Sequence, residues 1–406
     1  MFTQEAPSAP SAEEIYRLIR QEISPAFPLL TTCRSTAELL AHQAYRKIAP
    51  AVQRVLECPE AGDFSRETAP ARPSYRLLAW NLERGIQFDG QLEALRSHEY
   101  LRSCDVLLLT ETDVGMARSG NRRVAQEIAE ALGMHYAFAP CYLNLAKGAG
   151  IEWDVEDHNE LGLHGNAILS RYPLRNIRPV HLKNGKDKMA GREKRLGRQT
   201  ALVADVVFPN GALTAVSVHL DAQSSQRHRR DQMRDVLDAL PPAAPAVIGG
   251  DWNTTTYNSS RAFHAIAGFW LRVFMGVDNV IDNHYLHPYN WFEKDLFALI
   301  EDRGFDYRCC NRLGEHTTSY DVEDVKTHKN LREWVPAWCF AFIRWALRNH
   351  CGKCPLKIDW FATRGVETAD PVILREFREN RAVPLSDHDA IGVDIKLGWS
   401  ALLTKV

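Results

Sequence analysis

From Tyr75 onward, the chain alternates short apolar runs with segments whose apolar residues recur at helical spacing. A continuous apolar run such as the one that starts at Val106 is typical of a strand buried on both faces. One helical segment ends at Gly133, and glycine is the residue preferred directly after a helix end. Strands and helices in alternation predict a layered α/β fold.

We expect strands over residues 75–82, 105–113, 135–140, 164–173, 200–209, 212–220, 244–253, 358–365 and 390–397, and helices over residues 90–102, 121–133 and 227–242.

Two other stretches differ from this alternation. Residues 11–59 have helical periodicity with a break at Pro25 and Pro28, and the stretch 68–75 has the prolines of a linker. Residues 258–356 hold five of the ten tryptophans, and so long a segment between two strands is often a functional insertion over a site. The expected organisation is an N-terminal helical extension (1–70) and a main domain (75–397) interrupted by an insertion (about 258–356).

The composition excludes several classes of protein. The chain is 45% hydrophobic and 25% charged, which argues against a largely disordered chain or a fibre. It has 49 lysines and arginines against 51 aspartates and glutamates, so its formal net charge is −2. No chain-wide positive field is therefore available to bind a polyanion, although a local basic groove is compatible with these numbers.

The cysteines and the N-terminus favour the cytoplasm. Nine cysteines, an odd number, predict mostly reduced thiols. The first residues have neither the basic nor the apolar region of a secretory signal. The longest mostly apolar stretch, residues 334–343, is far shorter than the roughly 20 residues that a membrane-spanning helix needs. We expect a cytoplasmic protein without a transmembrane segment, with peripheral membrane contact as an open alternative.

Polar side chains recur at the ends of the predicted strands. They are Asn81, Glu111, His219, Asp251, Asn253, Asp359, Asp387 and His388. A single residue of this kind is more often a cap or a satisfied polar group. Because the strands of a twisted sheet deliver their ends to one rim, their recurrence within one domain predicts that they converge.

The residue types at these positions suit a hard cation. Carboxylates at Glu111 and Asp387, with the amide oxygen of Asn81, are ligands of the kind that Mg²⁺ or Mn²⁺ prefers. No cysteine or histidine cluster among them suggests zinc. The carboxylate of Asp251 can take a proton from water or orient it.

The remaining polar groups suit a phosphoryl substrate. The imidazoles of His219 and His388 and the amide of Asn253 can hydrogen-bond phosphoryl oxygens as charge develops there. Together with a cation they predict attack of water on a phosphate ester. The sequence contains neither a GxSxG nor a GxxxxGK[ST] motif, so we expect no covalent serine nucleophile and no P-loop.

These residues lie in motifs that occur in a fixed order. The motifs are AWNL (Asn81), LTETD (Glu111), HGNAILSRYP (164–173), HL (His219), GGDWN (Asp251, Asn253), IDW (Asp359) and SDH (Asp387, His388). The ordered set resembles the endonuclease/exonuclease/phosphatase superfamily, the fold of pancreatic DNase, from about residue 75 to residue 397 without the insertion. The resemblance implies a four-layered α/β sandwich, two mixed β-sheets flanked by helices, and divalent-metal hydrolysis of a phosphodiester or phosphomonoester.

The resemblance also implies roles for individual residues. Glu111 would be the main metal ligand, with Asn81 beside it and Asp387 at a second site.

The implied catalytic residues surround the phosphate. Asp251 would activate the water, and Asn253 would help to place the phosphate. His219 would contact the phosphate oxygens, and His388 would do likewise or act as an acid, with Asp359 holding its ring. An aspartate that orients an imidazole raises its basicity and fixes its tautomer.

Three residues are weaker candidates for contact with the substrate. His164 and Asn166 begin a predicted strand near the rim, where the superfamily often has a polar group, and a structural role is the alternative. Arg198, like Arg171, could contact an anionic substrate or lie on a solvated surface.

The substrate itself is left open, because the superfamily covers nucleases, inositol-phosphate phosphatases and sphingomyelinases. The basic loop 184–199 could steer nucleic acid, another phosphate-rich ligand or an anionic membrane, or be a solvated hairpin. The apolar, aromatic segment 331–350 suits a helix in a membrane interface or a lid helix buried on the domain. Four cysteines of the insertion could bind zinc or stay reduced: Cys309, Cys310, Cys351 and Cys354.

Three hypotheses for function follow. The first is a Mg²⁺- or Mn²⁺-dependent phosphodiesterase that acts on a lipid or a small phosphoester. The alternative is a nuclease on DNA or RNA with the same mechanism. A non-catalytic binding protein is disfavoured, because every chemical position carries a competent side chain.

Overall fold

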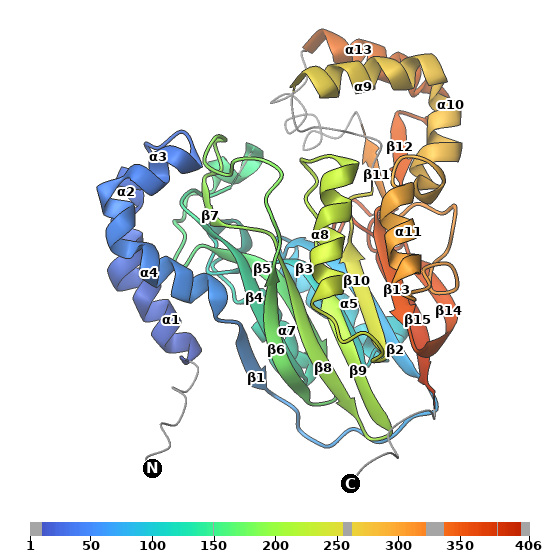
Figure 1. Cartoon of the computed structure of the whole chain (residues 1–406), viewed down its shortest axis with the longest axis horizontal. Coiled ribbons are helices and arrows are strands. Elements are labelled where there is room, and N and C mark those ends of the chain that lie inside the picture. The colour runs from blue at the N-terminus through green and yellow to red at the C-terminus, as the bar shows by residue number, and fades with distance from the viewer. Residues whose placement is uncertain (1–9, 149, 255–261, 322–336, 380, 399–406) are drawn as a thin grey trace.

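The computed structural model describes residues 10–148, 150–254, 262–321, 337–379 and 381–398. Within these residues, two large mixed β-sheets pack face to face, and helices cover their outer sides (Figure 1). The four-layered α/β sandwich that the sequence predicts is thereby confirmed. No helix in the described ranges has the length and apolar character needed to cross a bilayer.

The larger sheet has eight strands among the described residues, in the order β1-β4-β5-β3-β2-β15-β14, with β7 paired to β4. Its strands are β1 (Glu60–Asp63), β2 (Tyr75–Arg84), β3 (Val106–Val114), β4 (His135–Asn144), β5 (Leu163–Ser170), β7 (Arg195–Gly197), β14 (Val366–Leu374) and β15 (Ala390–Leu397). Strands β2 and β3 are parallel, and the other pairs of this sheet are antiparallel.

The smaller sheet has five described strands in the order β13-β10-β9-β8-β6. They are β6 (Leu174–His181), β8 (Thr200–Phe208), β9 (Gly211–Ser217), β10 (Ala246–Asp251) and β13 (Asp359–Arg364). Strands β9 and β10 are parallel, and their neighbours pair antiparallel.

Alternation along the strands builds the layers. In β3, Val106 and Leu108 point into the core between the two sheets, whereas Leu107 and Leu109 point into the core under the outer helices. A strand with both faces buried needs apolar residues at every position, which is why this run is continuously apolar.

The helices that cover the sheets are short. Those of the main domain are α5 (Phe88–Ser97), α6 (Glu99–Arg102), α7 (Val124–Leu132) and α8 (Gln226–Asp238). The expected helix over 90–102 is divided at His98, whose backbone is extended, and α7 ends as expected at Gly133 in the left-handed conformation.

The N-terminal helical segment is present and packs on the outer face of the larger sheet. Its helices are α1 (Ala12–Leu18), α2 (Phe27–Leu30), α3 (Thr36–Ala41) and α4 (Gln43–Glu57). Ile19 and Val55 belong to the same apolar core as Leu107. The segment also supplies β1 to the sheet, and the division of the chain near residue 70 stays a prediction.

Strands β1, β6 and β14 have no counterpart in the expected pattern. Each lies at an edge of its sheet and is only partly buried, so its sequence lacks the apolar run of a central strand.

Most of the insertion lies beyond the ends of the main sheets, where it forms helices and a small two-stranded sheet (Figure 1). Its elements are α9 (Ala262–Met275), α10 (Val277–Val280), α11 (Lys294–Asp302), β11 (Thr318–Asp321), α13 (Ala337–Ala346) and β12 (Lys353–Leu356). Helix α11 instead packs on the outer face of the smaller sheet, in the same apolar core as α8. Of the segment 331–350, residues 331–336 lie outside the described ranges.

The insertion's cysteines do not share one environment. Cys310 lies in the core between the sheets, whereas Cys354 packs against the apolar cluster of the insertion. Cys309 and Cys351 are exposed, and no group of metal-ligating side chains within the described residues includes any of these four thiols.

Candidate active site

Strand direction brings the polar residues of the two sheets to one rim. Asn81 and Glu111 lie near the carboxyl ends of the parallel strands β2 and β3, and Asp251 ends β10. Asp359 begins β13 rather than ending it, but β13 runs antiparallel to β10, so Asp359 is the direct cross-strand partner of Asp251. His388 reaches the rim in the same way, because it precedes β15, which runs antiparallel to β2.

Local breaks in the strands turn these side chains out of the regular ladder. The pairing of β2 with β3 shifts between Asn81 and Arg84, and the pairing of β3 with β5 shifts between Leu109 and Thr112. Glu111 lies inside the second shift and has a φ of 51°. Bulges and left-handed residues of this kind re-aim side chains at functional sites.

Glu111, Asn81 and Asp251 form the centre of the site. The Asn81 Nδ2 atom lies 3.3 Å from Glu111 Oε1 and 3.3 Å from Asp251 Oδ2. Asn81 and Asp251 are buried, and the Glu111 side chain is 17% exposed. Two carboxylates from different sheets thus face the same small region.

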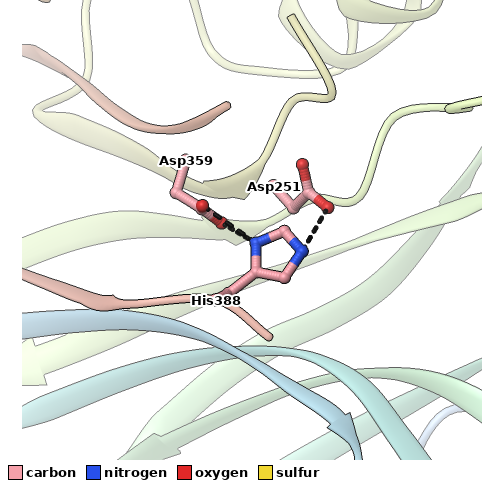
Figure 2. Close-up of side chains that lie close together, drawn as sticks. All are labelled: Asp251, Asp359 and His388. Atoms are coloured by element: carbon pink, nitrogen blue, oxygen red, sulfur yellow. Dashed lines mark hydrogen bonds and ion pairs between the residues drawn. The ribbon is translucent and has the colours of Figure 1, made fainter. Parts of the chain in front are cut away.

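His388 bridges Asp251 and Asp359, as Figure 2 shows. Its Nδ1 atom lies 2.9 and 3.1 Å from the two carboxylate oxygens of Asp359, and its Nε2 atom lies 3.7 Å from Asp251 Oδ2. The backbone of His388 is also held, since its N–H donates to Ser386 Oγ and its carbonyl accepts from Trp80 Nε1. The ring is therefore fixed with Nε2 toward Asp251.

His219 also contacts Asp251. Its Nε2 atom is 3.5 Å from Asp251 Oδ2, and its Nδ1 atom is 3.9 Å from Glu111 Oε1. The same Asp251 oxygen therefore faces two imidazoles, and both rings are nearly buried.

The buried charges shift the pKa values of these groups. Burial raises the pKa of Asp251, against the opposing effect of His388 and His219. Burial alone would lower the pKa of His388, but the carboxylates of Asp359 and Asp251 raise it well above its usual value. Burial alone would raise the pKa of Glu111, but the nearby positive charge of Arg84 and of the histidines lowers it well below its usual range.

The donor set fits a hard divalent cation. Glu111 and Asp251 supply carboxylate oxygens to one region, and Asp387 lies at its edge with its Oδ1 atom 4.0 Å from His388 Nε2. Asn81 Oδ1 accepts a hydrogen bond from the backbone N–H of Glu83, and the role of Asn81 as a ligand stays a prediction.

A second group of side chains in the site could also hold a metal ion. Asp251, Asp359 and His388 each offer one ligand atom, and these three atoms lie within 4.8 Å of one another. Both nitrogens of His388 already face carboxylates, which suits an imidazole held between two aspartates better than a metal ligand. The Glu111 side is therefore the better cation site.

Asn253 and Asp387 lie at the rim with different contacts. The backbone N–H of Asn253 donates to Asp251 Oδ1, and its side-chain Nδ2 donates to the carbonyl of Leu220. Asn253 thus orients the Asp251 carboxylate, and its contact with phosphate stays a prediction. The Asp387 side chain is 59% exposed.

The three weaker candidates are placed differently from one another. His164 is buried, with Nδ1 2.8 Å from Asp113 Oδ1. Asn166 donates from Nδ2 to the carbonyl of Thr200 and so ties β5 to β8. Arg198 is exposed. Their contact with substrate stays a prediction.

Sequence reasoning missed a network of buried charges beside Glu111. Arg84 Nε lies 3.7 Å from Glu111 Oε2, and Arg84 Nη1 lies 3.2 Å from Glu152. Arg118, which is almost fully buried, contacts Glu152 and Glu193 in turn. Arg84 lies two residues beyond the AWNL motif, close enough to have been noticed, whereas the other members come from separate loops and left no signal.

Comparison with known proteins identifies the family. A protein-family model described as Endonuclease/Exonuclease/phosphatase family matches residues 78–388. The chain belongs to this family. The Endonuclease/Exonuclease/phosphatase family comprises metal-dependent phosphoesterases and nucleases.

Individual relatives are distant. The chain is 28% identical over 145 residues to the uncharacterized protein YbhP of Escherichia coli (strain K12), and the alignment covers 35% of this chain and 51% of that protein. The chain thus spans about half the length of the curated relatives it matches.

Two solved structures are similar to the chain at low sequence identity. The endonuclease/exonuclease/phosphatase from Beutenbergia cavernae superposes with a TM-score of 0.49 at 16% identity, covering 80% of this chain and 72% of that one. The catalytic domain of human nocturnin gives a TM-score of 0.43 at 16% identity, with 84% and 97% covered.

Proposed function

We propose that this protein is a Mg²⁺- or Mn²⁺-dependent phosphodiesterase that acts on a lipid or a small phosphoester. The observation that carries the proposal is the position of Asp251. One oxygen of its carboxylate, Oδ2, faces Asn81 Nδ2 and the Nε2 atoms of His219 and His388. In this proposal a proton acceptor therefore adjoins both the cation site and the groups that bind phosphoryl oxygens.

Each side chain has a task in this proposal. Asp251 accepts the proton of the attacking water, and its raised pKa suits a group that must take up a proton near neutral pH. His388, held by Asp359, donates from Nε2 to a phosphoryl oxygen as negative charge develops. A divalent cation bound at Glu111 would supply further neutralisation of that charge.

The basic loop supports a small or lipid substrate over a polynucleotide. Lys188 is 3.3 Å from the buried Asp221, and Arg195 is paired with Glu193. Lys194 Nζ donates to backbone carbonyls, including that of Met189. Because these cations already have partners in the fold, the loop offers less free positive charge for a phosphate backbone than its sequence suggests.

A panel of substrates tests the proposal. Purified protein with Mg²⁺ or Mn²⁺ should hydrolyse bis(p-nitrophenyl) phosphate and, within a panel of phosphodiester lipids, nucleotides, RNA and DNA, prefer a lipid or small ester. Asp251→Ala and His388→Ala should each lower the turnover number by about 10²–10⁴-fold, the range that general acid–base groups contribute.

Two results would contradict the proposal. Turnover near the wild-type value in either variant would remove the mechanism. A marked preference for single- or double-stranded nucleic acid would replace the phosphodiesterase with a nuclease that uses the same residues.

A further inference from the structure

Two helices of the insertion form an arm, which consists of α9 (Ala262–Met275) and α13 (Ala337–Ala346). Both lie at one end of the molecule, beyond the ends of the sheets (Figure 1). Phe340 and Ile343 of α13 pack in one apolar cluster with Met275 and Val280. The insertion arm thus shares a small apolar core with the segments at its base.

The outer side of the arm is also apolar. On α9, Trp270, Leu271 and Phe274 are 40%, 53% and 83% exposed, and their spacing places them on one face of the helix. The rings of Trp270 and Phe274 lie side by side, with centroids 6.3 Å apart. Trp345 on α13 is 57% exposed. Several large apolar side chains exposed together on one element mark a surface that binds another protein, a membrane or a ligand.

The charges of the arm select the kind of partner. Neither α9 nor α13 contains an aspartate or a glutamate. Arg344 on α13 and Arg348 just beyond its end are exposed, and the Arg348 guanidinium lies 4.6 Å from the centre of the Trp345 ring. At the base of the arm, Asp278 is paired with His350 at 2.7 Å, and the exposed Asp282 follows one turn further from α9. The arm is therefore apolar and cationic.

This combination is that of an element that lies in a membrane interface, where apolar and tryptophan side chains enter the headgroup region and arginines face lipid phosphates. A second copy of the chain docked through the same face would instead set one cationic face against another, which costs energy.

We propose that the insertion arm docks onto the surface of an anionic phospholipid bilayer. Trp270, Leu271 and Phe274 enter the interface, and Arg344 and Arg348 contact lipid phosphates. The inference goes beyond the proposed reaction and is independent of it, because binding to a surface requires neither turnover nor a metal ion.

Vesicle flotation without divalent metal tests the inference. The full chain is mixed with vesicles of equal parts phosphatidylglycerol and phosphatidylcholine, or with vesicles of phosphatidylcholine alone. Wild type should float with the anionic vesicles, less with the neutral ones, and less again at high salt, because salt screens the arginines. The variant Leu271→Ser/Phe274→Ser should lower the bound fraction about tenfold or more.

Leu29→Ser is the matched control. Leu29 is 55% exposed on α2, like Leu271 at 53%, but it lies outside the arm. This variant should float like wild type, and circular dichroism should show all three proteins equally folded.

Three results would overturn the inference: wild type that does not float with anionic vesicles, a Leu271→Ser/Phe274→Ser variant that floats as well as wild type, or a Leu29→Ser variant that loses as much binding. Light scattering that finds a wild-type dimer and a monomeric arm variant would also overturn it, since a second copy would then cover the face. Loss of hydrolysis with intact flotation would contradict only the proposed enzyme.

Discussion

Replacing Asp359 with asparagine tests whether this carboxylate orients the catalytic imidazole. Asp359 and His388 are both buried, and His388 Nδ1 lies 2.9 and 3.1 Å from the two oxygens of Asp359. Asparagine has nearly the same volume, so the change removes the negative charge and leaves the packing almost unaltered. Asp359 touches His388 and not the expected position of the phosphate, so its role here is positioning.

The contact gives the size of the effect. A hydrogen bond to a charged group contributes about 1.5–3 kcal/mol. If His388 needs this bond only while charge develops on the phosphoryl group, its loss appears in the barrier, where about 1.36 kcal/mol is a factor of ten. We therefore expect the Asp359→Asn variant to lower kcat about 10–150-fold, with little change in KM.

The assay is metal-dependent hydrolysis of bis(p-nitrophenyl) phosphate, with kcat and KM determined separately. Asp394→Asn is the control. Asp394 lies on β15, the strand that follows His388, and its carboxylate is paired with Arg76 at 2.8 Å, away from the rim. It should alter stability without altering kcat. An Asp359→Asn variant with wild-type kcat, or a control with the same loss, would refute the reasoning.

Two further predictions concern charges near the site. Glu111→Gln should raise the Mg²⁺ concentration for half-maximal activity about tenfold or more. The control, Glu367→Gln at an exposed position, should leave this concentration unchanged. An unchanged Mg²⁺ titration of the Glu111→Gln variant would contradict a metal role for Glu111. Arg118→Met should lower the free energy of unfolding in urea by about 3–5 kcal/mol, because it leaves the fully buried carboxylate of Asp113 without its guanidinium partner. The exposed pair Arg20–Glu13 gives the comparison: Arg20→Met should cost at most about 1 kcal/mol, and equal losses would count against the buried network.

The predicted strands agree best with the structure where the local sequence alone requires one kind of residue. Continuous apolar runs marked the central strands β3 and β10, because a strand buried on both faces tolerates no other composition. They did not reveal the edge strands β6 and β14, whose exposed positions are free to be polar. For the site, the motif order predicted that Glu111, Asp251 and His388 belong together, and the structure joins them through Asn81 and the shared Asp251 carboxylate.

The buried network around Arg118 lay beyond prediction from the chain. Its carboxylates come from β3 and two separate loops, so no spacing in the sequence connects them. The same holds for the basic loop, whose charges look alike in the sequence, whereas in the fold Lys188 and Arg195 are ion-paired and Lys194 donates to backbone carbonyls.

The sequence by itself determined the layered architecture, the kinds of side chain available for chemistry and the family to which they belong. These properties depend on local composition and on motifs, which are fixed by the residues of each segment and not by its position in the fold. Only the tertiary structure decided that Asp359 meets Asp251 across antiparallel strands, that Lys188 and Arg195 of the basic loop are ion-paired, and that one face of the insertion arm is left apolar toward solvent. Such facts depend on strand direction and on contacts between residues far apart in the chain, which spacing along a sequence does not record.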